Sequence, residues 1–269
     1  MSVLHRLAFG TALLATFATA AAHAQERQVD RAAFRWSGEI PAGSWIEVRN
    51  LNGAVHVSAA SGRTTEVSAT KSWRRGDPKD VRFEVTKLAN GGMLICAIWG
   101  PESTCDERGY HSDDHRGRRD NDVEVEFTVR VPAGVKVDVG TVNGGVDVAG
   151  AGAEVVAATV NGAIDASTSV GPINATTVNG DIHATMRALG GGDEDMRFST
   201  VNGDVVLTLP GDFDADVDMS TVNGRFRTDY PVTVRGTINP HHLRATIGKG
   251  GRRLTFRTVN GNLELRKQG

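Results

Sequence analysis

The chain has 269 residues, with 30 lysines and arginines against 32 aspartates and glutamates, so its formal net charge at pH 7 is −2. A nucleic-acid-binding protein normally carries a strongly basic face, and this balance argues against one. Glycine is abundant at 32 residues and aromatic residues make up only 6 % of the chain, a composition that turn-rich β structure explains.

The first segment has the pattern of a secretory signal peptide. His5 and Arg6 give a basic start, an apolar stretch runs over residues 7–20, and residues 22–24 fit the small-x-small cleavage rule. The apolar stretch is shorter than the ~20 residues that span a bilayer. We therefore expect residues 1–24 to be a signal peptide and the mature chain to have no integral membrane segment. The expected location is the periplasm, the medium or the cell surface.

The mature chain, residues 25–269, is expected to form one domain. Its only cysteines, Cys96 and Cys105, are nine residues apart. In an oxidising compartment a local disulfide is the leading interpretation, and it would contribute about 2–3 kcal/mol. Metal or redox chemistry would need a third ligand or a CxxC spacing, and the chain offers neither. A polar loop is predicted at about residues 101–122.

The motif Thr-Val-Asn-Gly occurs six times, starting at residues 141, 159, 177, 200, 221 and 258, and residues 50–53 form a degenerate copy. Successive starts are 18, 18, 23, 21 and 37 residues apart, the last close to two periods. Apolar and polar residues alternate on both sides of each copy, which is typical of half-buried strands. A short period indicates one structural unit used repeatedly.

Two architectures fit this repeat. In one, each Asn-Gly is the turn of an antiparallel hairpin. In the other, each is the corner of a solenoid coil, and equivalent side chains stack about 4.8 Å apart. A hairpin does not require Thr-Val before every turn, whereas stacked coils favour identical residues. The sequence therefore predicts an all-β, single-domain β-solenoid with coils of about 18–23 residues and Asn-Gly corners.

The predicted structural corners share one residue type. Asparagine and glycine tolerate positive φ, so we expect these asparagines to turn the chain and their amides to stack from coil to coil. Asn161→Ala is then expected to cost about 1–2 kcal/mol, because alanine is strained at positive φ. A periodic ligand-binding row is the alternative interpretation. The corner residues are Asn52, Asn143, Asn161, Asn179, Asn202, Asn223 and Asn260.

The N-terminal half follows the same plan, because residues 40–53 align with residues 131–144 without a gap at an offset of 91. This alignment places Trp45 opposite Lys136 on the outer face. An outward tryptophan suggests a possible contact surface for a glycan or a protein. The alternative is that Trp45 packs beneath a neighbouring loop, such as the one closed by Cys96 and Cys105.

The Pro-Ala-Gly lead-in at residues 41–43 and 132–134, together with the recurring Thr-Val-Asn-Gly, resembles the bacterial putative-adhesin family, a domain-of-unknown-function group of exported β-solenoids. The resemblance covers roughly Phe34 to the C-terminus. It implies binding at the cell envelope or surface. It brings no catalytic set, so there are no site residues to transfer.

A search for chemistry finds no catalytic, cofactor-binding or metal-binding residues. Asp147 and Asp165 could stack as neighbours, but two surface acids are weak evidence for acid/base catalysis. His111 and residues 113–115 match no metal-ligand spacing and indicate a solvated loop. We therefore expect a non-enzymatic binding scaffold of the envelope, with an unknown envelope protein or glycan as its partner. The alternatives are a glycan-active β-helix enzyme and an envelope-stress sensor or regulatory partner.

Overall fold

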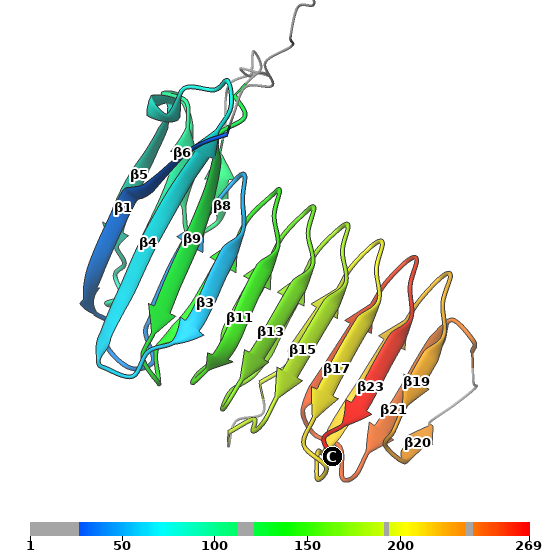
Figure 1. Ribbon diagram of the computed structural model, residues 1–269. Coiled ribbons are helices and arrows are strands. Elements are labelled where there is room, and N and C mark those ends of the chain that lie inside the picture. The colour runs from blue at the N-terminus through cyan, green and yellow to red at the C-terminus, as the bar shows by residue number, and fades with distance from the viewer. Residues whose placement is uncertain (1–26, 112–120, 191–193, 235–238) are drawn as a thin grey trace, which may run out of the picture.

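The computed structural model describes residues 27–111, 121–190, 194–234 and 239–269, so the predicted signal peptide lies outside the described residues. Two long sheets, A and B, pack face to face along the whole length of the molecule (Figure 1). A short 3-10 helix, η1 (Pro78–Asp80), and a small hairpin of β7 (Thr104–Asp106) and β8 (Gly109–His111) complete the described chain.

Sheet A contains ten strands. In chain order they are β1 (Gln28–Glu39), β3 (Val55–Ala59), β4 (Thr64–Trp73), β9 (Glu124–Val131), β11 (Val146–Ala151), β13 (Ile164–Thr168), β15 (Ile182–Met186), β17 (Val205–Leu209), β19 (Phe226–Thr228) and β23 (Leu263–Lys267). Their order across the sheet is β1-β4-β9-β3-β11-β13-β15-β17-β23-β19.

Sheet B contains eleven strands. In chain order they are β2 (Trp45–Arg49), β5 (Val81–Lys87), β6 (Met93–Trp99), β10 (Lys136–Gly140), β12 (Val155–Ala158), β14 (Ile173–Thr176), β16 (Met196–Ser199), β18 (Ala215–Ser220), β20 (Val232–Val234), β21 (His242–Ile247) and β22 (Arg253–Arg257). Their order across the sheet is β20-β21-β18-β22-β16-β14-β12-β10-β2-β6-β5.

Each repeated coil runs from a strand of sheet B through a Thr-Val-Asn-Gly corner into a strand of sheet A. Successive coils pair in parallel, as β12 does with β14 and β13 with β15. The corner asparagines are aligned from coil to coil by isolated parallel bridges, and the corners form the upper edge in Figure 1. The chain is therefore a β-solenoid, as the repeat predicted, and the hairpin alternative is wrong.

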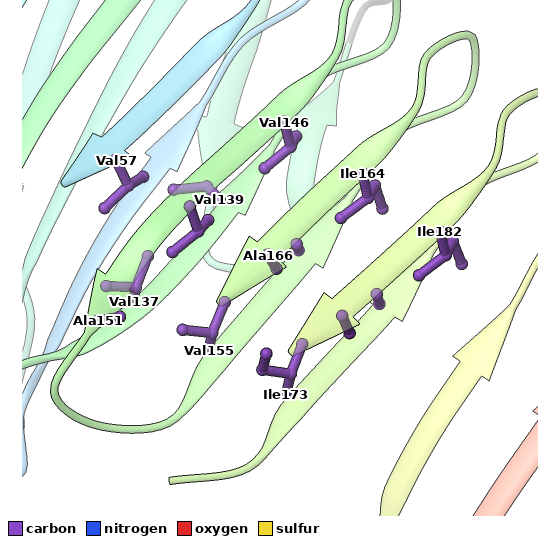
Figure 2. Packing of buried hydrophobic residues seen from close by; sticks show 14 of the residues in the cluster. Val57, Val137, Val139, Val146, Ala151, Val155, Ile164, Ala166, Ile173 and Ile182 are labelled. Atoms are coloured by element: carbon purple, nitrogen blue, oxygen red, sulfur yellow. The ribbon is translucent and has the colours of Figure 1, made fainter. Parts of the chain in front are cut away.

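The core lies between the two sheets. It consists of the apolar residues that alternate with polar residues along each strand and point inward. Figure 2 shows Val155 and Ile173 from sheet B facing the same interior as Ile164 and Ile182 from sheet A. These four side chains are fully buried. Burying each stabilises the fold by about 1.5–3 kcal/mol, so the alternation seen in the sequence directly defines the interior.

The threonine of each corner is buried and links two coils. Its Oγ1 donates a hydrogen bond to the carbonyl of the corner glycine in the neighbouring coil, at 2.8–3.0 Å in all six copies. A buried hydroxyl without a partner is costly. In the degenerate copy Asn50 replaces the threonine, and its Nδ2 donates to the carbonyls of Gly53 at 3.0 Å and Val125 at 2.8 Å.

The glycine of each corner is required by the close approach of the coils. A Cβ on Gly162 would come closer than 3.0 Å to the backbone carbonyl of Gly144, and one on Gly180 would do the same to Gly162. Real Cβ atoms essentially never approach a neighbour that closely. The repeated glycine thus reflects the spacing of stacked coils.

The corner asparagines stack as expected, but their backbone does not adopt the expected positive φ. Among the described residues every positive φ belongs to a glycine, so the strain predicted for Asn161→Ala does not arise from φ. Their amides form a ladder, in which the Nδ2 of one asparagine donates to the Oδ1 of a neighbouring one at 2.7–2.9 Å. Asn52 instead donates to the Val123 carbonyl at 3.0 Å. The donor–acceptor pairs are Asn161–Asn143, Asn179–Asn161, Asn202–Asn179, Asn260–Asn202 and Asn223–Asn260.

We still expect Asn161→Ala to lower the free energy of unfolding, by about 1 kcal/mol, because it removes two exposed amide hydrogen bonds. Denaturant unfolding of the mature chain measures this value. Asn161→Gly is the discriminating control. If positive φ were the cause, glycine would restore stability; if the ladder is the cause, glycine is no better than alanine.

Both ends of the solenoid contain strands out of chain order. At the C-terminal end β22 lies between β16 and β18, and β23 lies between β17 and β19. The last Thr-Val-Asn-Gly coil therefore fills a slot between the coils of Thr200 and Thr221. At the other end β9 lies between β3 and β4. The 37-residue spacing contains β20 and β21 instead of one further coil.

Antiparallel strands cap the parallel stack. β4 and β1 continue sheet A beyond β9, and β5 pairs antiparallel with β6. At the other end β21 and β20 continue sheet B beyond β18. Such terminal units prevent edge-to-edge growth of a repeat array, so the ends differ from the coils they cover.

Candidate binding surface

A disulfide-linked hairpin covers the N-terminal part of the outer face of sheet B. Cys105 of β7 is bonded to Cys96 of β6, and Tyr110 of β8 packs on the same small cluster, which includes Leu94 and Ile98. Tyr110 Oη also donates to the carbonyl of Trp99 at 2.9 Å. The described part of the predicted polar loop is therefore an ordered hairpin, whereas residues 113–115 lie outside the described residues.

A buried ionic cluster lies between the hairpin and the sheet. The Arg49 guanidinium contacts Glu47 Oε2 at 3.0 Å and both carboxylate oxygens of Asp138 at 2.9 Å, and donates to the carbonyl of Glu107 in the hairpin turn at 3.2 Å. Glu47 and Arg49 are only 7 % and 9 % exposed. Burial raises the pKa of Glu47 from its ordinary value, and the Arg49 charge partly opposes this shift. The cluster holds the hairpin to the sheet.

Trp45 lies at the start of β2 and pairs in register with Lys136 of β10, as the offset of 91 predicted. The Lys136 Nζ lies 5.1 Å from the centre of the Trp45 ring and 2.9 Å from Glu154 Oε2. Trp45 is half-buried and is not part of the apolar cluster under the hairpin. Its indole therefore forms part of the outer face of sheet B.

The middle of this face is a lane of small, uncharged side chains, which we call the sheet B lane. It crosses four neighbouring strands in register. At its N-terminal end a hollow of 280 Å³ separates it from Arg108 and Tyr110 of the hairpin. The lane consists of Gly140, Val156, Ala158, Asn174, Thr176 and Ser199.

The C-terminal part of the same face contains a hollow of 660 Å³, which we call the arginine hollow. Its floor is Thr255 of β22, which is 6 % exposed and lies in register between Arg197 of β16 and Asp218 of β18. The charged residues that line it are Arg197, Arg244, Arg253, Arg257, Asp195, Asp216 and Asp218.

The carboxylates of the arginine hollow are already engaged by protein donors. Asp218 contacts His242 at 3.1 Å and Arg244 at 3.2 Å. Asp216 accepts from the Thr246 hydroxyl at 2.9 Å, and Asp195 accepts from the backbone amide of Arg253 at 3.3 Å.

The arginines contrast with these carboxylates. In the part of the chain that the structure describes, the guanidinium groups of Arg197, Arg253 and Arg257 make no hydrogen bond or ion pair. This group could not be predicted from the sequence, because Arg197 becomes a neighbour of Arg253 and Arg257 only through the insertion of β22 beside β16. No local pattern in the sequence indicates that contact.

The outer face of sheet A carries a row of titratable side chains. His56, Asp147, Asp165 and His183 are in register across β3, β11, β13 and β15. His183 lies 3.1 Å from Asp165, and His56 lies 3.8 Å from Asp147. Both carboxylates are exposed, whereas a glycosidase acid is typically desolvated so that it holds its proton. The row does not resemble a hydrolytic pair.

The described residues contain no group of three histidine, cysteine, aspartate or glutamate side chains arranged to hold a metal ion. They also contain no helix with the length and apolar character needed to cross a membrane.

Taken together, these features define a capped β-solenoid whose polar surface chemistry lies on open sheet faces. The chain belongs to the family described as Toastrack DUF4097, which it matches over residues 46–266. A comparison with curated proteins finds no match.

Three solved structures are similar to this chain at 7–8 % sequence identity. A protein from Clostridium sporogenes titled a putative cell adhesion protein has a TM-score of 0.44 at 8 % identity, covering 90 % of this chain and 99 % of that chain. A putative adhesin from Bacteroides fragilis has a TM-score of 0.29 at 7 % identity, covering 90 % and 98 %. A putative adhesin from Parabacteroides merdae has a TM-score of 0.23 at 8 % identity, covering 88 % and 96 %.

Proposed function

We propose that this protein is a non-enzymatic, extracytoplasmic binding scaffold that contacts its partner through the outer face of sheet B. The observation that carries the proposal is the sheet B lane, a flat strip of small polar and apolar side chains between the disulfide hairpin and the arginine hollow. A flat face with hydrogen-bonding groups suits an extended ligand better than a small molecule, which generally needs a concave and mostly apolar site.

The compartment follows from two features. The signal-peptide pattern at residues 1–24 predicts export. The Cys96–Cys105 disulfide fits an oxidising compartment, because disulfides are rare in the cytosol. Periplasm and cell surface are both consistent with these features.

The alternative of a glycan-active enzyme needs a cleft with two carboxyl groups, one of which keeps its proton near neutral pH. Three aspartates line the arginine hollow, but Asp195 and Asp216 are exposed and Asp218 is held by His242 and Arg244. This arrangement favours binding over hydrolysis.

Affinity capture from envelope extracts, run beside a glycan panel, tests the proposal with the mature chain as bait. Ala158→Arg places a long charged side chain on the sheet B lane, and Ala149→Arg places the same side chain on the outer face of sheet A. Both alanines are exposed strand residues, so the two variants are matched. We expect Ala158→Arg to lose the captured partner and Ala149→Arg to keep it.

Trp45→Ala examines the N-terminal part of the same face and is expected to weaken capture without abolishing it. If Ala158→Arg and Trp45→Ala both retain every captured partner, or if only Ala149→Arg loses them, the sheet B face is not the binding surface.

A further inference from the structure

We propose that the arginine hollow binds carboxylate groups of an acidic polysaccharide. This inference rests on the proposed function, because it names the ligand class for the C-terminal part of the sheet B face. Three observations carry it: unpaired guanidinium groups, an unpartnered hydroxyl on the floor, and the spread of the positive charge along the sheet.

The charges of the hollow leave the arginines open to a ligand. The carboxylates of Asp195 and Asp218 have protein donors at 3.1–3.3 Å, while the guanidinium groups of Arg197, Arg253 and Arg257 have no partner within the described residues. A guanidinium presents a planar fork of N–H donors that matches a carboxylate, and such charge-assisted bonds are about twice as strong as neutral ones. An incoming carboxylate therefore meets three available donors.

The floor of the hollow supplies a second, independent feature. Thr255 is 6 % exposed, and its hydroxyl has no hydrogen-bond partner among the described residues although it lines the hollow. The Thr255 hydroxyl is not one of the fully buried polar atoms without a partner among the described residues, so it reaches the solvent of the hollow and is open to a ligand. A ligand oxygen at this position would satisfy the Thr255 hydroxyl.

The positive charge is spread over a length that suits a polymer. Arg253 and Arg257 are four residues apart on β22, so their Cα atoms are about 13 Å apart at 3.3 Å per residue. Arg197 lies on the neighbouring strand, β16. A chain with an acidic group on successive units can engage all three arginines at once, whereas one small anion engages fewer.

The surroundings favour a glycan over a protein partner. The hollow adjoins Ser199 and, on the next strand, Thr176 and Asn174, which supply hydroxyl and amide groups without charge. These groups suit the hydroxyl-rich rim of a sugar chain. A protein interface is typically centred on aromatic or other apolar anchors. The apolar residues that line the hollow, Met196, Val217 and Ala245, are at most 6 % exposed, so the hollow presents no exposed apolar anchor.

Binding of the mature chain to polygalacturonate oligomers, measured by titration calorimetry at low and high NaCl, tests this proposal. We expect the triple variant Arg197→Gln/Arg253→Gln/Arg257→Gln to bind at least about tenfold more weakly, because tenfold corresponds to 1.4 kcal/mol. The matched triple Arg63→Gln/Arg225→Gln/Arg227→Gln changes the net charge equally away from sheet B and is expected to leave affinity within about twofold. Salt should weaken the wild-type complex.

Thr255→Val keeps the side-chain shape and removes the hydroxyl, so it tests the contribution of this hydroxyl to binding without changing the charge of the hollow. It is expected to weaken polygalacturonate binding about fivefold, the effect of one hydrogen bond of about 1 kcal/mol. Unchanged affinity in both Thr255→Val and the arginine triple would overturn the proposal.

Four polymers are compared to define the ligand class. We expect neutral dextran to bind weakly and polygalacturonate to bind more tightly than either oligo-dT or polyphosphate. Equal binding of dextran would show that the carboxylates are not recognised, and equal binding of oligo-dT or polyphosphate would indicate an unselective polyanion site. If polygalacturonate does not bind while Ala158→Arg still loses the captured partner, the proposed function stands and this inference fails.

Discussion

Replacing Gly180 by alanine is expected to lower the free energy of unfolding by about 3 kcal/mol, at the upper end of the usual cost of overpacking. The added Cβ would overlap the carbonyl of Gly162 in the neighbouring coil. To relieve this overlap the two coils must separate, which stretches the hydrogen bond from Thr177 Oγ1 to the Gly162 carbonyl at 2.9 Å and the one from Gly162 N to Asn179 O at 3.0 Å. The backbone at one corner cannot move without disturbing the hydrogen bonds that join successive coils along the solenoid.

Denaturant unfolding of the mature chain measures this loss, and Gly62→Ala is the matched control. Gly62 lies in the turn between β3 and β4, where a Cβ would meet nothing within 4 Å. Its substitution is expected to change stability by less than about 0.5 kcal/mol. Equal unfolding midpoints for the two variants would show that the coils are not packed as closely as the structure has them.

Arg49→Met is expected to cost about 3 kcal/mol at pH 7, because it keeps much of the side-chain volume and removes the partner of a buried carboxylate. Glu47 is 7 % exposed and would then face Asp138, a like charge, without the guanidinium between them. The hairpin also loses the bond from Arg49 to the Glu107 carbonyl. Arg266→Met, which breaks the exposed ion pair with Glu264, is the control and is expected to lower stability much less than Arg49→Met, because solvent screens the pair.

The loss from Arg49→Met should depend on pH in a defined direction. Burial raises the pKa of Glu47 above its ordinary 4.5, so the folded protein binds this proton more tightly than the unfolded chain. Stability therefore falls as the pH rises from about 4.5 through the raised value. Without Arg49 the pKa rises further, and the fall becomes larger. We expect the difference between wild type and Arg49→Met to be smaller at pH 4.5 than at pH 7, and a difference independent of pH would contradict this account of the cluster.

Most of the fold could be predicted from the repeat in the sequence. Identical residues at a short period are explained by columns in which each side chain meets its own counterpart, as the asparagine ladder and the threonine bonds show. The offset of 91 likewise predicted that Trp45 lies beside Lys136. These contacts join equivalent positions of neighbouring coils, so an alignment of the copies is enough to find them.

The backbone conformation of the corners could not be predicted from an alignment of the copies. Asn-Gly is a common signal for positive φ, yet the described asparagines do not adopt it. Their identity is explained by the hydrogen bond that an amide makes with an amide in the next coil, and the glycine is explained by the carbonyl that lies against it. Residue preference alone does not distinguish a strained corner from a stacked one.

By itself the sequence determined that the chain forms parallel coils, how long each coil is, and which side chains face the interior, because these depend on contacts that every copy repeats. Only the tertiary structure decided which coils are neighbours. Any Thr-Val-Asn-Gly corner can form the same amide, hydroxyl and carbonyl contacts with any other. The similarity of the corners therefore predicts that the coils stack, but it does not predict which coil lies next to which. The order here, with β22 between β16 and β18, brings Arg197 to the same hollow as Arg253 and Arg257.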